Sequence, residues 1–265
     1  MTWNTATTIS LLVGLIIVIA VAYIGSQHRM TEAFGNANPY KGKVVLVTGS
    51  TRGIGHAIAE HAASQGAKAV IVNGRTTEGV EKTKTELGVD GYVADVGHYE
   101  ACKALVQYAL KKHQRIDILV NNAVQLHNTS GLLEMDHNDW DAEMKTNMHA
   151  PIYMSQIVLQ SATTPVQIIN IGSGAANIDE TSAVPGSYII AKNALSKMTT
   201  MMASEIDGSD NTVSLLQIDG TVDTELTKDM DLAKTKRLTI DVVLKSLDNL
   251  LLKPANGAIV STDSV

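Results

Sequence analysis

Short runs of apolar, often β-branched residues alternate with longer helix-like stretches along most of this 265-residue chain. The runs are at 44–47, 69–72, 91–94, 116–120, 167–171, 213–218 and 258–260, and the helix-like stretches are at 54–65, 78–87, 100–113, 140–162, 188–206 and 241–251. Continuous apolar strands that alternate with helices are typical of a parallel sheet covered by helices on both faces. The pattern therefore predicts one doubly wound α/β domain with a seven-stranded parallel sheet.

The composition removes several classes of protein. A single cysteine excludes a disulfide framework and a thiolate metal site. The eight histidines do not pair with acidic residues or cysteine at metal-ligand spacing, so we predict no metal site. The formal net charge of −6 argues against nucleic acid as a partner, because nucleic-acid binders usually present a basic face.

The first 27 residues contain no charged side chain. Within them, residues 6–25 form an uncharged, mainly apolar run whose helical length of about 30 Å matches the hydrocarbon core of a bilayer. Lys and Arg occur only after this run, beginning at Arg29, and this bias places the following domain in the cytosol. We predict a transmembrane anchor at 1–27, a linker at 28–41 and a domain at 42–265, hence a single-pass membrane protein.

Two alternatives to the anchor are open. Ala20-Val-Ala22 resembles the small residues at a signal-peptide cleavage site, although the basic segment that usually opens such a peptide is absent. The same run could also form a buried helix of the domain core.

The first predicted strand runs directly into a glycine-containing loop with the sequence TGSTRGIG at residues 48–55. Glycines let a backbone turn tightly and approach a pyrophosphate, and the N-terminus of the following helix supplies amide donors. Such a loop can also be a simple turn. Its position between the first strand and a helix favours phosphate binding.

The spacing TGxxxGxG resembles the short-chain dehydrogenase/reductase family, and other motifs match that family in order. Residues 121–124 (NNAV) resemble its NNAG after the fourth strand, with Val124 in place of glycine, and residues 219–224 (DGTVDT) resemble its PGxVxT, with Asp219 in place of proline. The resemblance covers about residues 41–260 and implies a Rossmann fold that binds a nicotinamide dinucleotide. It assigns cofactor binding to Thr48, Gly49, Ser50, Arg52, Gly53, Ile54, Gly55, Arg75, Asp95, Val96, Asn122, Ala123, Tyr188, Lys192, Gly220, Val222 and Thr224.

The end of the second strand bears on the choice of nucleotide. An NAD enzyme is expected to place an acidic residue there, to accept hydrogen bonds from the ribose hydroxyls. This chain has Asn73-Gly74-Arg75 instead. Arg75, and Arg52 in the glycine loop, could neutralise a 2′-phosphate, which favours NADP(H) over NAD(H). The alternative is that both arginines are solvated surface charges.

Tyr188 and Lys192 are four residues apart and so share one face of a predicted helix. Ser173 precedes Tyr188 by fifteen residues, and Asn147 precedes Ser173 by twenty-six. This order and spacing match the Asn-Ser-Tyr-Lys tetrad of the short-chain dehydrogenase/reductase family, which makes all four candidate catalytic residues. Each of them alone would be an ordinary polar residue of a helix or loop.

The resemblance implies a role for each member. Tyr188 would exchange a proton with the substrate oxygen and Ser173 would donate a hydrogen bond to it, so both are predicted to bind substrate. Lys192, with the oxidised nicotinamide, is expected to lower the pKa of Tyr188 from about 10 and to hold ribose hydroxyls. Asn147 would hold a water that links Lys192 to solvent.

These features predict an NADP(H)-dependent alcohol dehydrogenase or carbonyl reductase that interconverts a carbonyl and a secondary alcohol. A membrane anchor favours a lipophilic small-molecule substrate, because such molecules partition into the bilayer. The short, charged segment 225–239 could be a mobile lid. The resemblance also implies a homodimer through the helices after the fourth and fifth strands. The alternative is a nucleotide-binding sensor or scaffold with the same fold and no turnover.

Overall fold

The computed structural model describes residues 37–126, 131–177, 184–224, 227 and 236–264. Within the chain, Pro39–Val265 forms one compact unit that contains all of the described helices and strands. The predicted anchor at 1–27, most of the linker and most of the segment 225–239 lie outside the described residues. No helix in the described part of the chain is long and apolar enough to cross a membrane.

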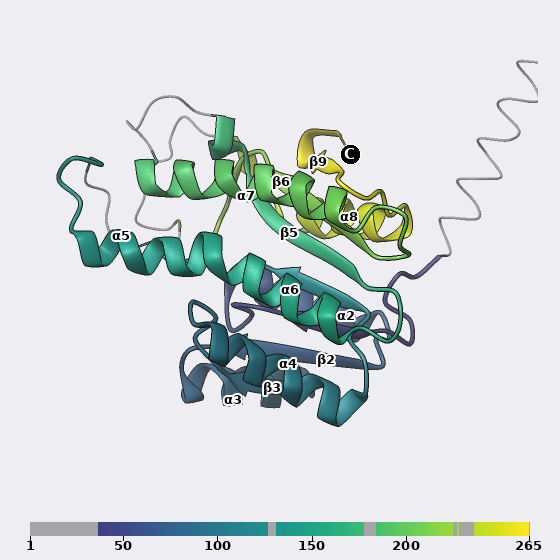
Figure 1. The fold of residues 1–265 in the computed structure, drawn as a ribbon. Coiled ribbons are helices and arrows are strands. Elements are labelled where there is room, and N and C mark those ends of the chain that lie inside the picture. Colours follow the sequence, from purple (N-terminus) through teal and green to yellow (C-terminus); the bar gives the residue numbers. More distant parts are fainter. Residues whose placement is uncertain (1–36, 127–130, 178–183, 225–226, 228–235, 265) are drawn as a thin grey trace, which may run out of the picture. The chain divides into compact units, whose positions relative to one another are not determined.

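Seven parallel strands form the central sheet, as the alternating pattern predicts (Figure 1). They are β1 (Val44–Val47), β2 (Ala69–Gly74), β3 (Asp90–Val93), β4 (Ile118–Asn121), β5 (Gln167–Ser173), β6 (Thr212–Ile218) and β9 (Ile259–Ser261). Their order in the sheet is β3-β2-β1-β4-β5-β6-β9. The order reverses direction between β1 and β4, and in such sheets a ligand binds beyond the carboxyl ends of the strands at this switch point.

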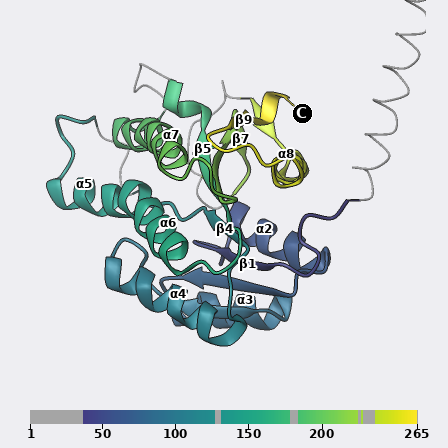
Figure 2. The same cartoon turned by 45° about the vertical axis from the view of Figure 1, so that its right-hand side comes forward.

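Helices cover both faces of the sheet (Figure 2). They are α2 (Gly53–Ser64), α3 (Thr77–Leu87), α4 (Tyr99–His113), α5 (His137–Met144), α6 (Ala150–Ser161), α7 (Gly186–Glu205) and α8 (Ile240–Leu252). Successive residues of β1 point to opposite faces. Leu46 joins a buried cluster with Leu105 of α4, whereas Val47 joins a second cluster with Ile58 of α2 and Leu247 of α8. This two-sided burial explains why the interior strands are mainly apolar, whereas the edge strands β3 and β9 are only partly buried.

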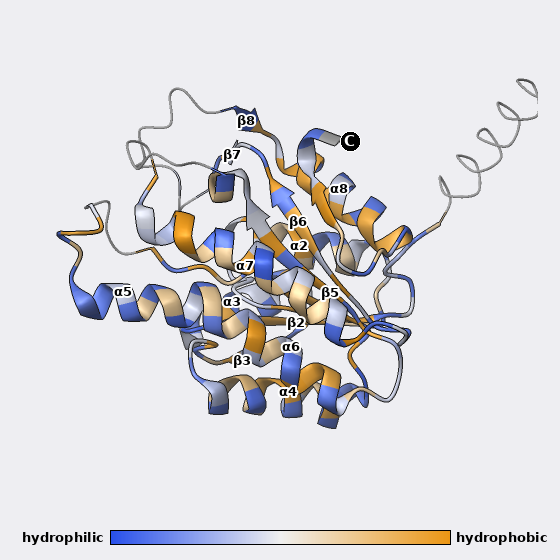
Figure 3. Ribbon diagram, turned by 45° about the horizontal axis from the view of Figure 1, so that its top comes forward, coloured by the Kyte–Doolittle hydropathy of each residue, from blue (hydrophilic) through white to orange (hydrophobic). Residues whose placement is uncertain are grey.

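The hydropathy of the helices agrees with this arrangement. In Figure 3, hydrophilic and hydrophobic residues alternate along α4 and α8, as expected for helices with one face on the sheet and one in water. In α8, the buried residues include Val243, Leu247 and Leu250, which recur at helical spacing.

The predicted helix at 140–162 differs from the structure, because a π turn at Lys145–His149 separates α5 from α6. The helical segment also begins earlier than predicted, at His137, where the Asp136 carboxylate accepts a hydrogen bond from the Asn138 N–H (2.8 Å). Pro151 is the second residue of α6 and has no N–H to donate to the carbonyl four residues earlier, that of Asn147. The wider turn therefore lies where an ordinary helical hydrogen bond cannot form.

Two short strands beyond the main sheet were not predicted. β7 (Thr221–Val222) and β8 (Arg237–Leu238) pair in parallel and join the chain after β6 to the chain before α8. The Thr221 N–H donates to the Lys236 carbonyl (2.7 Å). Pairing of this kind joins residues that are distant in sequence, so short apolar runs do not indicate it.

Candidate active site

The glycine loop between β1 and α2 lies tightly against the loop that follows β4. Gly49 has a positive φ of 62°, and a Cβ there would lie 2.6 Å from the Ala123 Cα. A Cβ on Gly55 would lie 2.3 Å from the Asn122 Nδ2 and 2.6 Å from the Gly49 carbonyl oxygen. Only glycine fits at these two positions, because protein atoms of the neighbouring loop and of Gly49 lie where a Cβ would be.

Hydrogen bonds join the same two loops. The Thr48 Oγ1 accepts from the backbone N–H groups of Asn122 (3.0 Å) and Ala123 (3.1 Å). In return, the Asn122 Nδ2 donates to the carbonyls of Thr48 (2.9 Å) and Gly49 (3.0 Å). Two predicted cofactor residues, Thr48 and Asn122, therefore hold the loops in place, and Asn122 also lines the site.

The first turn of α2 fits an anionic group. Its N-cap residue, Arg52, makes no side-chain cap hydrogen bond, and the turn contains no acidic residue. The N-terminal amides of a helix without such a cap are available to a ligand, and the helix dipole favours negative charge there. A glycine loop with no room for side chains, followed by these amides, forms a cradle that suits a pyrophosphate.

Asn73, at the end of β2, has a role that the sequence did not reveal. It is buried, and its Oδ1 accepts from the Gly49 N–H (3.3 Å). Its Nδ2 donates to the carbonyls of Tyr92 (3.2 Å) and Ala94 (3.0 Å). The sequence showed only that an uncharged amide stands where an NAD enzyme is expected to have an acidic residue. In the structure this amide fastens the glycine loop to β2 and β3.

Two neighbouring cavities lie at the carboxyl ends of the strands. The smaller, of about 160 Å³, is lined by predicted cofactor residues: Gly49, Arg52, Gly53, Ile54, Gly55, Arg75, Asp95, Val96, Asn122, Ala123 and Thr224. The larger, of about 400 Å³, is lined by Ser173, Tyr188 and Lys192, and also by Gly220 and Val222. Ile54, Asn122, Val124 and Thr224 line both, so the cavities adjoin. Ser50 is buried and lines neither; its Oγ accepts from the Asn73 N–H (2.9 Å).

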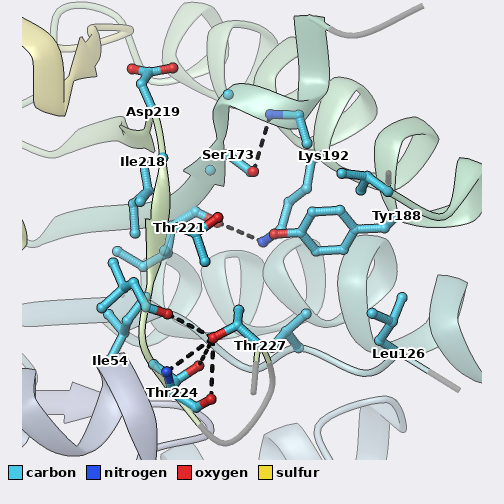
Figure 4. A pocket seen from close by; sticks show the side chains of 18 of the residues that line it. Ile54, Leu126, Ser173, Tyr188, Lys192, Ile218, Asp219, Thr221, Thr224 and Thr227 are labelled. Atoms are coloured by element: carbon cyan, nitrogen blue, oxygen red, sulfur yellow. Dashed lines mark hydrogen bonds between the residues drawn. The ribbon is translucent and has the colours of Figure 1, made fainter. Parts of the chain in front are cut away.

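Ser173, at the end of β5, and Tyr188 and Lys192, in the first two turns of α7, meet on the wall of the larger cavity (Figure 4). The Lys192 Nζ donates to the Ile171 carbonyl of β5 (2.7 Å) and lies 5.6 Å from the centre of the Tyr188 ring. The Ser173 Oγ accepts from the Ala175 N–H (3.2 Å). Strand β5 and helix α7 thus bring together three members of the predicted tetrad.

Burial shifts the pKa values of two of these groups. It lowers the pKa of Lys192 from 10.5 to about 8, because the side chain is only 5% exposed and the charged form is poorly solvated. It raises the pKa of Tyr188 above 10, and the Ser173 hydroxyl acts in the opposite direction. In the protein without cofactor, loss of solvation is the larger of the two effects on Tyr188. The lowering expected from Lys192 together with the oxidised nicotinamide stays a prediction.

Asn147, the fourth member, lies in the π turn and is buried. Among the described residues it lines neither cavity. Its Nδ2 donates to the Gln125 carbonyl (2.7 Å) and its Oδ1 accepts from the Gln125 N–H (2.8 Å). The side chain therefore fixes the chain that follows β4.

The two departures from the family motifs have different structural consequences. Val124, in place of glycine, adds a side chain to the boundary between the two cavities. Asp219, in place of proline, accepts hydrogen bonds from the Gln217 Nε2 (2.7 Å) and the Ser261 Oγ, and its N–H donates to the Thr262 Oγ1 (3.0 Å). It thereby ties the end of β6 to the chain from β9 onward.

Residues 43–235 match the family model described as short chain dehydrogenase. Dehydrogenase/reductase SDR family member 4 from Mus musculus is 34% identical over 188 residues, which make up 68% of this chain and 66% of the mouse protein. A 3-oxoacyl-(acyl-carrier-protein) reductase from Vibrio cholerae is 33% identical over 192 residues, which make up 71% of this chain and 77% of that protein. The chain therefore belongs to the short-chain dehydrogenase family, whose members are oxidoreductases that bind a nicotinamide cofactor.

Solved structures agree with the fold. A short chain dehydrogenase from Burkholderia cenocepacia in complex with NADP has a TM-score of 0.76 at 24% identity, over 84% of this chain and 97% of that chain. A double mutant of a short-chain dehydrogenase/reductase from Serratia marcescens has a TM-score of 0.75 at 28% identity, over 84% of this chain and 97% of that chain.

The buried Lys192 ammonium should reduce the stability of the fold at neutral pH. Its folded pKa of about 8 lies below its unfolded value, so this cost is present below pH 8 and disappears as the pH rises toward about 10.5. We expect Lys192→Met to raise the free energy of unfolding at pH 7 by about 2 kcal/mol. Removing the buried charge is expected to stabilise the fold by roughly 3 kcal/mol. Loss of the hydrogen bond to the Ile171 carbonyl offsets about 1 kcal/mol of that gain. Urea denaturation at pH 7 and pH 10 should show the gain disappearing.

Lys197→Met, at an exposed position of the same helix, is the matched control and should leave stability nearly unchanged at both pH values. If Lys192→Met raises the free energy of unfolding equally at pH 7 and pH 10, the lowered pKa of Lys192 is contradicted.

Proposed function

We propose that this protein is an NADP(H)-dependent alcohol dehydrogenase or carbonyl reductase that interconverts a carbonyl and a secondary alcohol, with Tyr188 as general acid and base. The observation that carries the proposal is the meeting of Ser173, Tyr188 and Lys192 on one cavity wall, beside a second cavity built on the glycine loop. The names of the mouse and Vibrio relatives, a dehydrogenase/reductase and a 3-oxoacyl reductase, support the same reaction class.

The bound cofactor would supply or accept the hydride, and the chain itself would supply the proton and the binding of the oxygen. The glycine loop and the first turn of α2 would hold the pyrophosphate, and Lys192 would hold the nicotinamide ribose hydroxyls. Ser173 would donate a hydrogen bond to the substrate oxygen and stabilise negative charge as it develops there.

Tyr188 is protonated at neutral pH and can donate a proton, although its raised pKa opposes the transfer until the phenolate is stabilised. When it gives its proton to the substrate oxygen, the phenolate forms beside the Lys192 ammonium. The Ile171 carbonyl keeps that ammonium in place. Lys192 thus acts mainly on the ionised tyrosine, a state in which its charge offsets the loss of solvation.

Asn147 supports this chemistry through its position. Its backbone carbonyl lies four residues before Pro151, which cannot donate to it, so this carbonyl is a candidate holder of a water that resupplies protons. The side chain meanwhile fixes the loop after β4. We therefore assign the predicted role of Asn147, which is to hold a water that links Lys192 to solvent, to its backbone carbonyl.

The preference for NADP(H) is supported by the charges at the smaller cavity. Arg52 and Arg75 are exposed and line it, and both could bind a 2′-phosphate. Asn73, the residue at the end of β2, is buried and bonded to backbone groups, so it cannot read ribose hydroxyls as an acid would. The Burkholderia structure, which holds NADP, is consistent with this preference.

The larger cavity favours an apolar substrate. Beyond the catalytic side chains, much of its wall is aliphatic, from Val124, Leu126, Ile171, Val184 and Ile218. Burial of apolar substrate surface against such a wall is favourable, whereas the reacting oxygen meets Ser173 and Tyr188. We propose a lipophilic ketone or aldehyde as the substrate class.

Tyr188→Phe should abolish turnover and retain cofactor binding. Loss of the proton donor is expected to lower kcat by at least about 100-fold, with the Kd for NADPH within about two-fold of the unsubstituted chain. NADPH oxidation against a panel of lipophilic ketones and aldehydes measures the first, and NADPH fluorescence measures the second. Tyr99→Phe on α4 is the matched control.

Unchanged turnover in Tyr188→Phe would exclude Tyr188 as the proton donor. If the full chain binds NADPH but reduces no carbonyl, the alternative of a silent sensor or scaffold is favoured instead.

Arg75→Asp should shift the cofactor preference toward NADH. The substitution removes a cation from the smaller cavity and places an anion there, which repels a 2′-phosphate. We expect the ratio of NADPH to NADH affinity to fall by at least about 30-fold, equivalent to about 2 kcal/mol. An unchanged ratio, measured by fluorescence titration, would show that the arginines do not select the nucleotide.

We also propose that residues 1–27 form a single membrane-spanning helix that holds the domain at the cytosolic face. The support is the charge-free segment and the basic residues that follow it. The full chain should sediment with membranes and resist alkaline extraction, and a variant without residues 1–27 should stay in the supernatant. A mature N-terminus near Ala22 would indicate a cleaved signal peptide and contradict the anchor.

The homodimer implied by the family resemblance is supported by a hollow between the α5 segment and α7. It has a volume of about 450 Å³, includes Trp140, Met144, Met148 and Ile190 in its wall, and leaves Ile190 41% exposed. Light scattering should show a dimer for the unsubstituted chain and a monomer for Ile190→Glu. A dimer that persists in Ile190→Glu would place the contact elsewhere.

A further inference from the structure

Gln125, the residue after the NNAV motif, connects three parts of the nucleotide site. Its backbone N–H and carbonyl are both bonded to the side chain of Asn147, at 2.8 and 2.7 Å. Asn147 is buried in the π turn and so provides a rigid support. The backbone position of Gln125 is therefore fixed independently of its own side chain.

The side chain of Gln125 extends this connection to the smaller cavity. Its Oε1 accepts from the Arg75 Nη1 (2.8 Å) and from the Thr146 Oγ1 (3.0 Å). A carbonyl oxygen has two lone pairs, so both are used. Arg75 and Thr146 both line the smaller cavity, and Thr146 is buried. A buried hydroxyl thus helps to orient the amide oxygen that holds an exposed arginine.

This bond has a consequence for the binding of an anion. Among the described residues, Gln125 supplies the one side-chain acceptor of the Arg75 guanidinium. The bond engages one of its five N–H groups, so the others can bind a phosphate. An arginine that is already held at the cavity loses less conformational freedom when the anion arrives, and this preorganisation raises the affinity.

We propose that Gln125 is a positioning residue that sets the preference for NADP(H) by holding Arg75 at the smaller cavity. This inference rests on the proposed NADP(H) dependence and adds a residue that would not itself touch the 2′-phosphate. The end of β2 offers no substitute, because the side chain of Asn73 is bonded to backbone groups. A chain of hydrogen bonds thus connects Asn147 in the π turn through Gln125 to Arg75.

Gln125→Leu tests the proposal, because it removes the acceptor, keeps a similar volume and leaves the backbone contacts with Asn147 intact. We expect the Kd for NADPH to rise roughly three- to ten-fold, since one hydrogen bond to a charged group is lost. The Kd for NADH should stay within about two-fold, because NADH has no 2′-phosphate for Arg75 to bind. Both are measured on the full chain by fluorescence titration.

A double-mutant cycle separates positioning from a general loss of structure. In an Arg75→Ala background, Gln125→Leu should change neither Kd further, because the group that it positions is absent. Gln107→Leu, at an exposed position of α4, is the matched control and should change neither Kd. If Gln125→Leu does not fold, Gln125→Asn replaces it, because its shorter side chain keeps the amide but moves it away from Arg75.

The outcomes separate this inference from the proposed function. A chain that binds NADPH no better than NADH contradicts the proposed cofactor. If NADPH is preferred and Arg75→Ala removes the preference, an unchanged ratio in Gln125→Leu overturns the role of Gln125 alone. Equal weakening of both nucleotides, or tighter NADPH binding once Arg75 is released, overturns it as well.

Discussion

The close approach of two loops at the carboxyl ends of β1 and β4 is the constraint on which the site depends. Gly49 and Gly55 have no room for a side chain, and the Thr48 hydroxyl and Asn122 amide join the loops with four hydrogen bonds. This contact lies at the switch point of the sheet, between the neighbouring strands β1 and β4. It leaves the first turn of α2 directed at one cavity and the residues after β5 directed at the next.

Buried amides continue the same construction away from the loops. Asn73 fastens the glycine loop to β2 and β3, and Asn147 fastens the loop after β4 to the π turn. Because each amide both donates and accepts, one side chain can satisfy backbone groups from two segments at once. The cavities are thus walled by loops whose positions depend on buried polar bonds, and the residues directed at a ligand are held from behind.

The same burial determines the electrostatics of the catalytic wall. It lowers the pKa of Lys192 to about 8 and raises the pKa of Tyr188, so burial disfavours the charged form of each group in the free protein. Proton transfer from Tyr188 would reverse this, because a phenolate and an ammonium stabilise one another. The site is therefore better matched to the charges of the reaction than to those of the resting state, as expected for preorganised catalysis.

Much of this could be predicted from the sequence, because two-sided burial makes the interior strands of the main sheet apolar runs and because the site residues follow the strands. The π turn could not, since its hydrogen bond from the Ala150 N–H to the Lys145 carbonyl leaves no pattern in the sequence of residues 140–162. The role of Asn73 was hidden because a sequence shows the missing acid and not the partners of the amide. The direction of the pKa shift of Tyr188 depends on burial, which the spacing from Lys192 does not reveal.

The central claim is that carbonyl reduction occurs at the wall formed by Ser173, Tyr188 and Lys192. It is tested most directly by incubating the full chain with NADPH deuterated at the nicotinamide C4 position and a lipophilic ketone, and examining the product by mass spectrometry. The account predicts a secondary alcohol with a single deuterium on the former carbonyl carbon, and no such product from Tyr188→Phe. Saturating NADPH binding without transfer of deuterium to any ketone or aldehyde would contradict it.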